Sequence, residues 1–193
     1  AARISSTPRE SVSVASLTPT TALGGTTAFD ETIGGIRIAE QGAPVMASLA
    51  MLKGKASAFT KAAGAHLGAL PGPGRSQVYN RTGTVWMGPD QYLVEGMGAA
   101  ALAAAFGASA AVTDQSDAWV RFDATGDDVV AMLERLSNAD SRRMAQGDAT
   151  RTAIHHMHCV VICRAGRTEF TILGPRSSAA SLHHALVAAA ASL

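Results

Sequence analysis

The densest group of side chains that could bind a metal or act as a nucleophile runs from His155 to Cys159, with Cys163 four residues further on. Residues two apart on a strand point to the same side, so His156 and His158 have a spacing that suits zinc ligation. The same alternation sends both cysteines to the other side, and no second ligand pair stands out elsewhere. We therefore expect no metal site: the histidines lie at the start of a strand, and the thiols pack as small hydrophobes.

Other reactive residues are better explained by structure than by catalysis. Asp127 and Asp128 could pair as acid and base, but they precede a stretch with helical spacing, and a helix N-terminus favours anions. His183 and His184 fit the border between the buried and solvated faces of an amphipathic helix. The sequence has no nucleophile elbow, P-loop or GxGxxG pattern. We expect no catalytic and no cofactor-binding residue in this chain.

The charge balance excludes some partners. Lys and Arg number 16 and Asp and Glu 15, so the chain lacks the basic excess that binds nucleic acid or an anionic membrane. Charged residues make up 16% of the chain, against about 25% in typical soluble domains. Either other chains cover part of this surface, or an alanine-rich genome has diluted the charge. The composition leaves both explanations open.

The cysteines and apolar stretches bear on the compartment. Cys159 and Cys163, the only cysteines, would lie roughly 13 Å apart on a strand, too far for a disulfide, which fits a reducing compartment. The N-terminal stretch lacks an apolar run of signal-peptide length, and the alanine-rich stretch 99–112 is too short to span a bilayer. We expect a cytoplasmic protein without a membrane partner.

The chain divides into an arm and one domain. Residues 1–33 contain Pro8, Pro19 and paired glycines but show neither a helical nor a strand period. Such a segment cannot bury enough apolar surface to order itself, so we expect an extended arm that is disordered or lies against a partner. Residues 34–193 are expected to form a single α+β domain.

Within that domain, one pattern of elements occurs twice. Strand, helix, strand, strand, helix appears in each half, with equivalent elements offset by roughly 70 to 80 residues. The pattern predicts two pseudo-repeats, about 36–110 and 111–193, with helices against one face of a mainly antiparallel sheet. Thr125, with Asp128 three residues on, is the expected N-cap of one helix, and Ser177 or Ser178 that of the last. The expected strands are 36–40, 45–52, 82–87, 92–95, 118–124, 156–164 and 168–173, and the expected helices are 55–67, 98–106, 126–136 and 178–191.

Two stretches of these elements resemble a known family, the gamma subunit of heterotetrameric sarcosine oxidase. The first, from Trp86 to Leu93, is similar to that family's Trp-x-Gly-Pro-Asp-Glu-Trp-Leu hairpin, and the second, from Phe170 to Leu182, to its closing strand followed by Arg-Ser-x-Ala-x-Ser-Leu-Trp. The loop around Asp140 and Gly147 resembles the segment between them, and the likeness spans about residues 36–190. The matching residues, all expected to be structural, are Trp86, Gly88, Pro89, Asp90, Leu93, Asp140, Gly147, Arg176, Ser177, Ala179, Ser181 and Leu182.

The chain departs from the family pattern at four positions. Gln91, Tyr92 and His183 stand where the family has Glu, Trp and Trp, and Ser141 stands where Leu is usual. These changes leave the N-methyl amine substrate open.

The resemblance implies a four-chain flavoenzyme that oxidises sarcosine to glycine, with hydrogen peroxide and either formaldehyde or methylenetetrahydrofolate as the other products. It places NAD and tetrahydrofolate in an alpha subunit, FAD and FMN in a beta subunit, and zinc in a delta subunit, with no cofactor in gamma. It also implies a fold similar to the folate-binding domain of the aminomethyltransferase family. A shared fold does not by itself transfer folate binding.

We therefore expect a non-catalytic structural subunit whose partners are the alpha, beta and delta chains. One rival is a free-standing folate-dependent aminomethyltransferase or repair protein with the same fold. Another is a small zinc-dependent enzyme that uses His156 and His158.

Overall fold

The computed structural model describes residues 20–42 and 44–193, which form eleven strands and four α-helices. The strands are Asp30–Ile33 (β1), Ile36–Gln41 (β2), Met46–Met51 (β3), Ser76–Tyr79 (β4), Thr82–Gly88 (β5), Gln91–Glu95 (β6), Ala110–Asp114 (β7), Trp119–Thr125 (β8), Ala149–Ile154 (β9), Met157–Ala165 (β10) and Glu169–Pro175 (β11). The α-helices are Ala56–His66 (α1), Ala99–Phe106 (α2), Val129–Leu136 (α3) and Ala179–Ala191 (α4), and short 3-10 turns cover Gly107–Ser109 and Arg176–Ser178.

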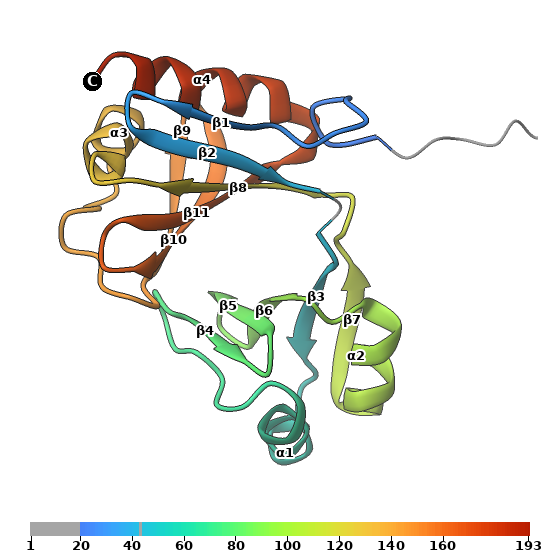
Figure 1. Ribbon diagram of the computed structural model, residues 1–193. Coiled ribbons are helices and arrows are strands. Elements are labelled where there is room, and N and C mark those ends of the chain that lie inside the picture. The colour runs from blue at the N-terminus through green and yellow to red at the C-terminus, as the bar shows by residue number, and fades with distance from the viewer. Residues whose placement is uncertain (1–19, 43) are drawn as a thin grey trace, which may run out of the picture.

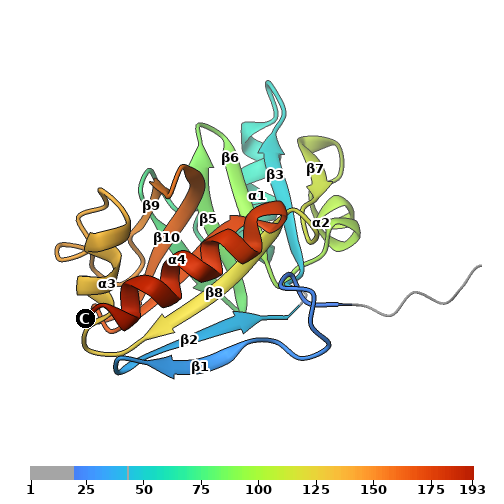
Figure 2. The ribbon, with the colours of Figure 1, turned by 90° about the horizontal axis from the view of Figure 1, so that it is seen from above.

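Two antiparallel sheets lie face to face, with helices on the outer side of each (Figure 1). One has the strand order β1-β2-β8-β11-β10-β9, and the other has the order β4-β5-β6-β3-β7. Helices α3 and α4 cover the first sheet, and Figure 2 shows α4 running across its strands. Helices α1 and α2 cover the second sheet. The predicted α+β class with mainly antiparallel sheets is confirmed.

The predicted duplication is present in the strand order. The series β3-α1-β4-β5-β6-α2 recurs as β8-α3-β9-β10-β11-α4, and each series builds its sheet in the same order, β4-β5-β6-β3 and β9-β10-β11-β8. Equivalent elements keep their spacing: β3 begins at residue 46 and β8 at residue 119, and α1 begins at 56 and α3 at 129, a shift of 73 in both cases.

The two repeats exchange their first strands. β2 directly precedes β3 in the chain but pairs with β8, and β7 directly precedes β8 but pairs with β3. Neither sheet is therefore complete without a strand from the other repeat.

A local two-fold axis passes between Arg75 and Asp148. The backbone N–H of Ser76 donates to the carbonyl of Gly147 (2.7 Å), and that of Ala149 donates to the carbonyl of Gly74 (2.8 Å). Gly74 and Gly147 are equivalent in the two repeats, and both have a positive φ, 70° and 85°. Glycine adopts this conformation without the steric cost that a Cβ would bring. Arg75 and Asp148 themselves form an ion pair across the axis.

The expected strands correspond to the central strands of both sheets, and the strands that were missed are the four edge strands: β1, β4, β7 and β9. β1 lies in the stretch expected to be an arm, and β9 follows the loop around Asp140 and Gly147, where no strand was expected. Edge strands pair on one side only, so they are short and need little apolar alternation. Residues 1–19 of the expected arm lie outside the described residues.

Of the expected helix caps, Ser178 is confirmed in position and Thr125 is wrong. Thr125 ends β8, paired with Glu169 and Arg37, and cannot also begin a helix. Helix α3 starts three residues later than expected, with Asp128 at its N-cap position but without a side-chain hydrogen bond. Helix α4 starts after a 3-10 turn, and Ser178 at its N-cap makes no side-chain hydrogen bond either.

A thin apolar layer joins the two sheets. Its buried members come from both repeats: Met46, Val85, Leu93, Ala149, Val160, Ile162 and Leu173, with Met87 and Trp119 packed against them. Larger apolar clusters fill the spaces between each sheet and its helices.

Candidate functional site

The histidines do not form the ligand pair considered from the sequence. His155 and His156 make the two-residue turn between β9 and β10, both with positive φ (45° and 69°), a pattern typical of tight hairpin turns. His156 therefore lies outside the strand that carries His158. Within residues 20–42 and 44–193, no three His, Cys, Asp or Glu side chains gather as metal ligands.

The two cysteines are free and buried, as the sequence predicted. Both face the cluster under α3 and α4. Burial raises the pKa of the Cys159 thiol to about 11. The thiolate is the nucleophilic form of cysteine, so Cys159 is not a nucleophile near neutral pH.

His183 is a packing residue. Its ring meets that of Phe29 edge-on at a centroid distance of 4.2 Å and lies 6.1 Å from that of Phe122. Burial lowers the pKa of His183, with partial compensation from Glu31 and Glu40. Its Nε2 atom is buried and has no hydrogen-bond partner among the residues that the structure describes. The imidazole of His183 thus packs as an aromatic ring against Phe29 and Phe122. The neighbouring His184 is exposed.

The family-motif residues lie in different parts of the fold and form no single site. In the hairpin, Trp86 lies on β5, Leu93 is buried on β6, and Asp90 takes the positive-φ position of the turn. Asp140 is exposed and pairs with Arg143 at 3.5 Å. The remaining motif residues lie at the end of β5 and in the turn that follows (Gly88 and Pro89), at the local two-fold axis (Gly147), beside the segment at Thr20 (Arg176), and on or before α4 (Ser177, Ala179, Ser181 and Leu182).

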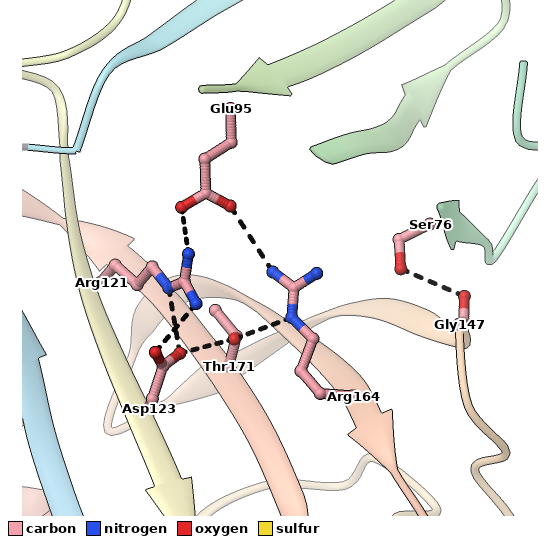
Figure 3. Close-up of polar contacts among 7 residues, drawn as sticks. All are labelled: Ser76, Glu95, Arg121, Asp123, Gly147, Arg164 and Thr171. Carbon is pink, nitrogen blue, oxygen red and sulfur yellow. Dashed lines mark hydrogen bonds and ion pairs between the residues drawn. The ribbon is translucent and has the colours of Figure 1, made fainter. Parts of the chain in front are cut away.

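The best-assembled polar site is an ion cluster at one end of the inter-sheet layer (Figure 3). We use this name for Glu95 on β6, Arg121 and Asp123 on β8, Arg164 on β10 and Thr171 on β11. The guanidinium of Arg121 donates from Nε and Nη2 to the two carboxylate oxygens of Asp123 (2.9 and 2.8 Å), and from Nη1 to Glu95. One arginine thus binds carboxylates from both sheets.

Arg164 completes the ion cluster. Its Nε donates to the hydroxyl of Thr171 (2.9 Å), which donates in turn to Asp123 (2.6 Å), and its Nη2 lies 3.6 Å from Glu95. Two guanidiniums therefore face two carboxylates, and the site is neutral. Such a network pairs each charge with an opposite charge and links the two sheets.

The four charged side chains are mostly shielded from water, with 19% to 23% of each exposed. Burial opposes the charge of Arg121, but Asp123 and Glu95 outweigh it and raise the pKa of Arg121. Burial and the neighbouring Arg121 lower the pKa of Arg164, and Glu95 and Asp123 only partly offset this. Arg121 is thus the better-matched cation of the pair.

A hollow of about 520 Å³ opens beside the ion cluster. Val45, Val78, Gly83 and Gly96 line it, Arg81 lies exposed at its rim, and three members of the ion cluster form its charged side. The shielded charges that face this hollow already have partners within the chain.

In the expected strand 118–124, Val120 and Phe122 alternate with Arg121 and Asp123, which places the two charges on one face but does not connect them to Glu95 or Arg164. The available signal was the alternation itself. Opposite charges two apart on β8, and Arg164 in register with buried Val160 and Ile162 on β10, put charge on a face that is otherwise apolar. Which strands of the two sheets face each other is set by the tertiary fold, so Glu95 could not be assigned.

Comparison with known proteins gives a fold but no sequence relative. No protein-family model matches the chain, and no curated protein sequence does either. Among solved structures, it is similar to a heterotetrameric sarcosine oxidase from Corynebacterium sp. U-96 in complex with pyrrole 2-carboxylate, with 21% identity and a TM-score of 0.71. The match covers 81% of this chain and 84% of that chain. The two chains have the same fold.

A second solved structure is the aminomethyltransferase T of the glycine cleavage system from Bartonella henselae, with 14% identity and a TM-score of 0.53. Here the match covers 83% of this chain but only 53% of the other. The fold predicted from the sequence, similar to the folate-binding domain of aminomethyltransferases, agrees with this neighbour.

Proposed function

We propose that this chain is a non-catalytic structural subunit, of the gamma type, in a heterotetrameric flavoenzyme that oxidises sarcosine to glycine. Its partners would be the alpha, beta and delta chains, which would carry FAD, FMN, NAD, zinc and tetrahydrofolate. The products would be hydrogen peroxide with formaldehyde or methylenetetrahydrofolate. In this role the chain contributes contact surface, and a cytoplasmic location follows from that of such a complex.

The observation that carries the proposal is the mutual coverage of the sarcosine oxidase match. It takes up 81% of this chain and 84% of the other, so the matched chain has nearly the length of this one. The aminomethyltransferase match leaves almost half of that enzyme without a counterpart. The likeness thus extends over most of the sarcosine oxidase chain but over only about half of the aminomethyltransferase, which favours the subunit role.

The use of the polar residues supports a structural role. The ion cluster is neutral and links the sheets, Cys159 holds its proton, and His183 packs as an aromatic ring. Each of these groups is already engaged in stabilising the fold. The carboxylates of the ion cluster already accept hydrogen bonds, the Cys159 thiol keeps its proton, and the Nε2 atom of His183 is shielded from water.

Affinity purification of the tagged chain from its own cells tests the proposal. We expect three other chains, the alpha, beta and delta subunits, to co-purify with it in fixed ratio. The complex should show a flavin absorbance spectrum and oxidise sarcosine. The isolated chain should oxidise no N-methyl amine. A soluble, monodisperse monomer with an N-terminal segment protected from protease would contradict the proposal, as would turnover by the isolated chain.

The folate-dependent rival is separated by titration of the isolated chain with tetrahydrofolate. Tight stoichiometric binding would favour a free-standing aminomethyltransferase-like protein, whose fold this chain shares. We expect no such binding, because the guanidiniums and carboxylates beside the 520 Å³ hollow already pair with one another.

A further inference from the structure

Three adjoining hollows lie at the end of the inter-sheet layer away from the ion cluster, and all three are lined by Arg151. Their volumes are about 540, 280 and 390 Å³. We call this region the open end. The open end and the ion cluster lie at opposite ends of the same two strands. Trp119 and His158 stand at the beginning of β8 and β10, whereas Asp123 and Arg164 lie towards the other ends of these strands.

Arg151 has no charged partner in the part of the chain that the structure describes. It forms neither an ion pair nor a side-chain hydrogen bond with residues 20–42 or 44–193, and no Asp or Glu lines the three hollows. Asp148, three residues away, is already paired with Arg75. Burial and, to a lesser extent, Asp90 raise the pKa of Tyr92, so a carboxylate lies near this side of the open end. Asp90 does not line any of the three hollows.

The duplication relates the open end to the hollow beside the ion cluster. Arg151 is the third residue of β9, as Val78 is of β4, and His158 is the second residue of β10, as Gly83 is of β5. Val78 and Gly83 line the hollow beside the ion cluster, whereas Arg151 and His158 line the open end. The two places are equivalents under the repeat.

The open end and the hollow beside the ion cluster differ in whether their arginines form ion pairs. Beside the ion cluster, the carboxylate of Glu95 meets both Arg121 and Arg164. The equivalent of Arg121 at the open end is Ser48, the third residue of β3, which lines one of the hollows. The open end thus has a guanidinium and an exposed imidazole but no carboxylate from residues 20–42 or 44–193.

The walls of the open end are mainly apolar. Met87 and Trp119 each line two of the three hollows, Val160 lines two, and Cys159 and Ala153 line one. Gln91 and Gln115 add polar atoms at one side. Volumes of a few hundred Å³, apolar walls and a small number of placed polar groups are typical of sites for small molecules.

We propose that the open end is a binding site for a small organic carboxylate whose apolar body carries a single acid group. The fork of N–H groups on Arg151 receives the carboxylate through two parallel hydrogen bonds, the geometry in which arginine binds carboxylates best. The apolar body packs against Trp119 and Met87. This inference rests on Arg151 and its surroundings and is independent of the proposed subunit role.

Intrinsic fluorescence provides the test, because the only two tryptophans, Trp86 and Trp119, both line hollows that Arg151 shares. The full chain is titrated with benzoate and, separately, with benzyl alcohol at constant ionic strength. We expect a saturating change in emission with benzoate and a much weaker response to the alcohol, which has the ring without the acid. Equal responses to both would overturn the proposal.

The variant Arg151→Gln should weaken benzoate binding at least about tenfold, because it removes a charge-assisted pair of hydrogen bonds. Arg81→Gln is the matched control: it removes an exposed arginine at the rim of the equivalent hollow and should leave the affinity unchanged. Arg151→Lys keeps the charge without the fork and should give an intermediate affinity. An affinity unaffected by Arg151→Gln, in a variant with the wild-type circular dichroism spectrum, would refute the site.

Discussion

The two ends of the inter-sheet layer are built on equivalent strands but differ in how their charged side chains are paired. At one end, Arg121 and Arg164 meet Glu95 and Asp123, so the charges are matched within the chain. At the other, Arg151 has no such partner among the described residues, and hollows surround it. Duplication of a unit supplies two copies of one cavity, and a few charged positions decide which copy joins the sheets and which remains open to a ligand.

The largest expected effect comes from Arg121→Gln at the matched end. This change removes the guanidinium that donates to both Asp123 and Glu95, and leaves Asp123 with the hydroxyl of Thr171 and Glu95 with Arg164. Breaking a buried ion pair costs 3–5 kcal/mol, and the roughly one-fifth exposure of these groups reduces the expected loss of unfolding free energy to about 3 kcal/mol. Urea denaturation measures it. A loss below about 1 kcal/mol would mean that the ion cluster does not tie the sheets together.

The next prediction concerns Cys159, which lines one of the hollows at the open end but is buried. Its pKa is raised from 9.0 to about 11 by burial, so the thiolate fraction near pH 8 falls about a hundredfold. Alkylation by iodoacetamide in the native chain, located by mass spectrometry, should be slower than for a free thiol by at least that factor and should rise with pH towards 11. The urea-unfolded chain is the control, and native alkylation at its rate would contradict the prediction.

A smaller effect is expected for the pair formed by Glu95 and Arg164, whose charged atoms lie 3.6 Å apart without a hydrogen bond. A double-mutant cycle with Glu95→Gln and Arg164→Gln should give a coupling energy of about 1 kcal/mol in urea denaturation. The same cycle for Glu95 and Arg121 should give more, because these two residues are hydrogen-bonded. A larger coupling energy for Glu95 with Arg164 than for Glu95 with Arg121 would contradict the prediction that Arg121 is the better-paired cation.

The smallest effect is expected for Arg151→Gln at the open end. Because Arg151 is exposed and makes no ion pair among the described residues, its removal should change the free energy of unfolding by less than about 0.5 kcal/mol. Thermal and urea unfolding of this variant beside Arg121→Gln measure the contrast between the two ends directly. A large loss of stability would show that Arg151 serves the fold rather than a ligand.

The central parts of the fold could be predicted from the sequence, and its margins could not. Strands such as β8 show apolar residues in strict alternation, because one face packs under helices and the other faces the second sheet. Edge strands such as β1, with Asp30, Glu31 and Thr32 exposed, leave no such pattern. The start of α3 was missed for a related reason: Thr125 has the right side chain for a cap, but strand pairing already holds its backbone.

The candidate sites were predictable only in part. Burial of Cys159 and Cys163 followed from alternation on one strand. The pairing of Glu95 with Arg121 and the surroundings of Arg151 depend on how one sheet lies on the other. The position of His156 in the turn between β9 and β10 could not be predicted either, because the sequence pattern indicates a strand but not the residue at which it begins.

The crossing of β2 and β7 between the repeats has a consequence for the history of the chain. A single repeat standing alone would leave its own sheet lacking one strand and would present one strand with nothing to pair with. Two identical copies could satisfy each other by trading these strands around a symmetry axis, the axis that still passes between Arg75 and Asp148. The present chain therefore has the architecture expected of an intertwined homodimer whose subunits became joined end to end.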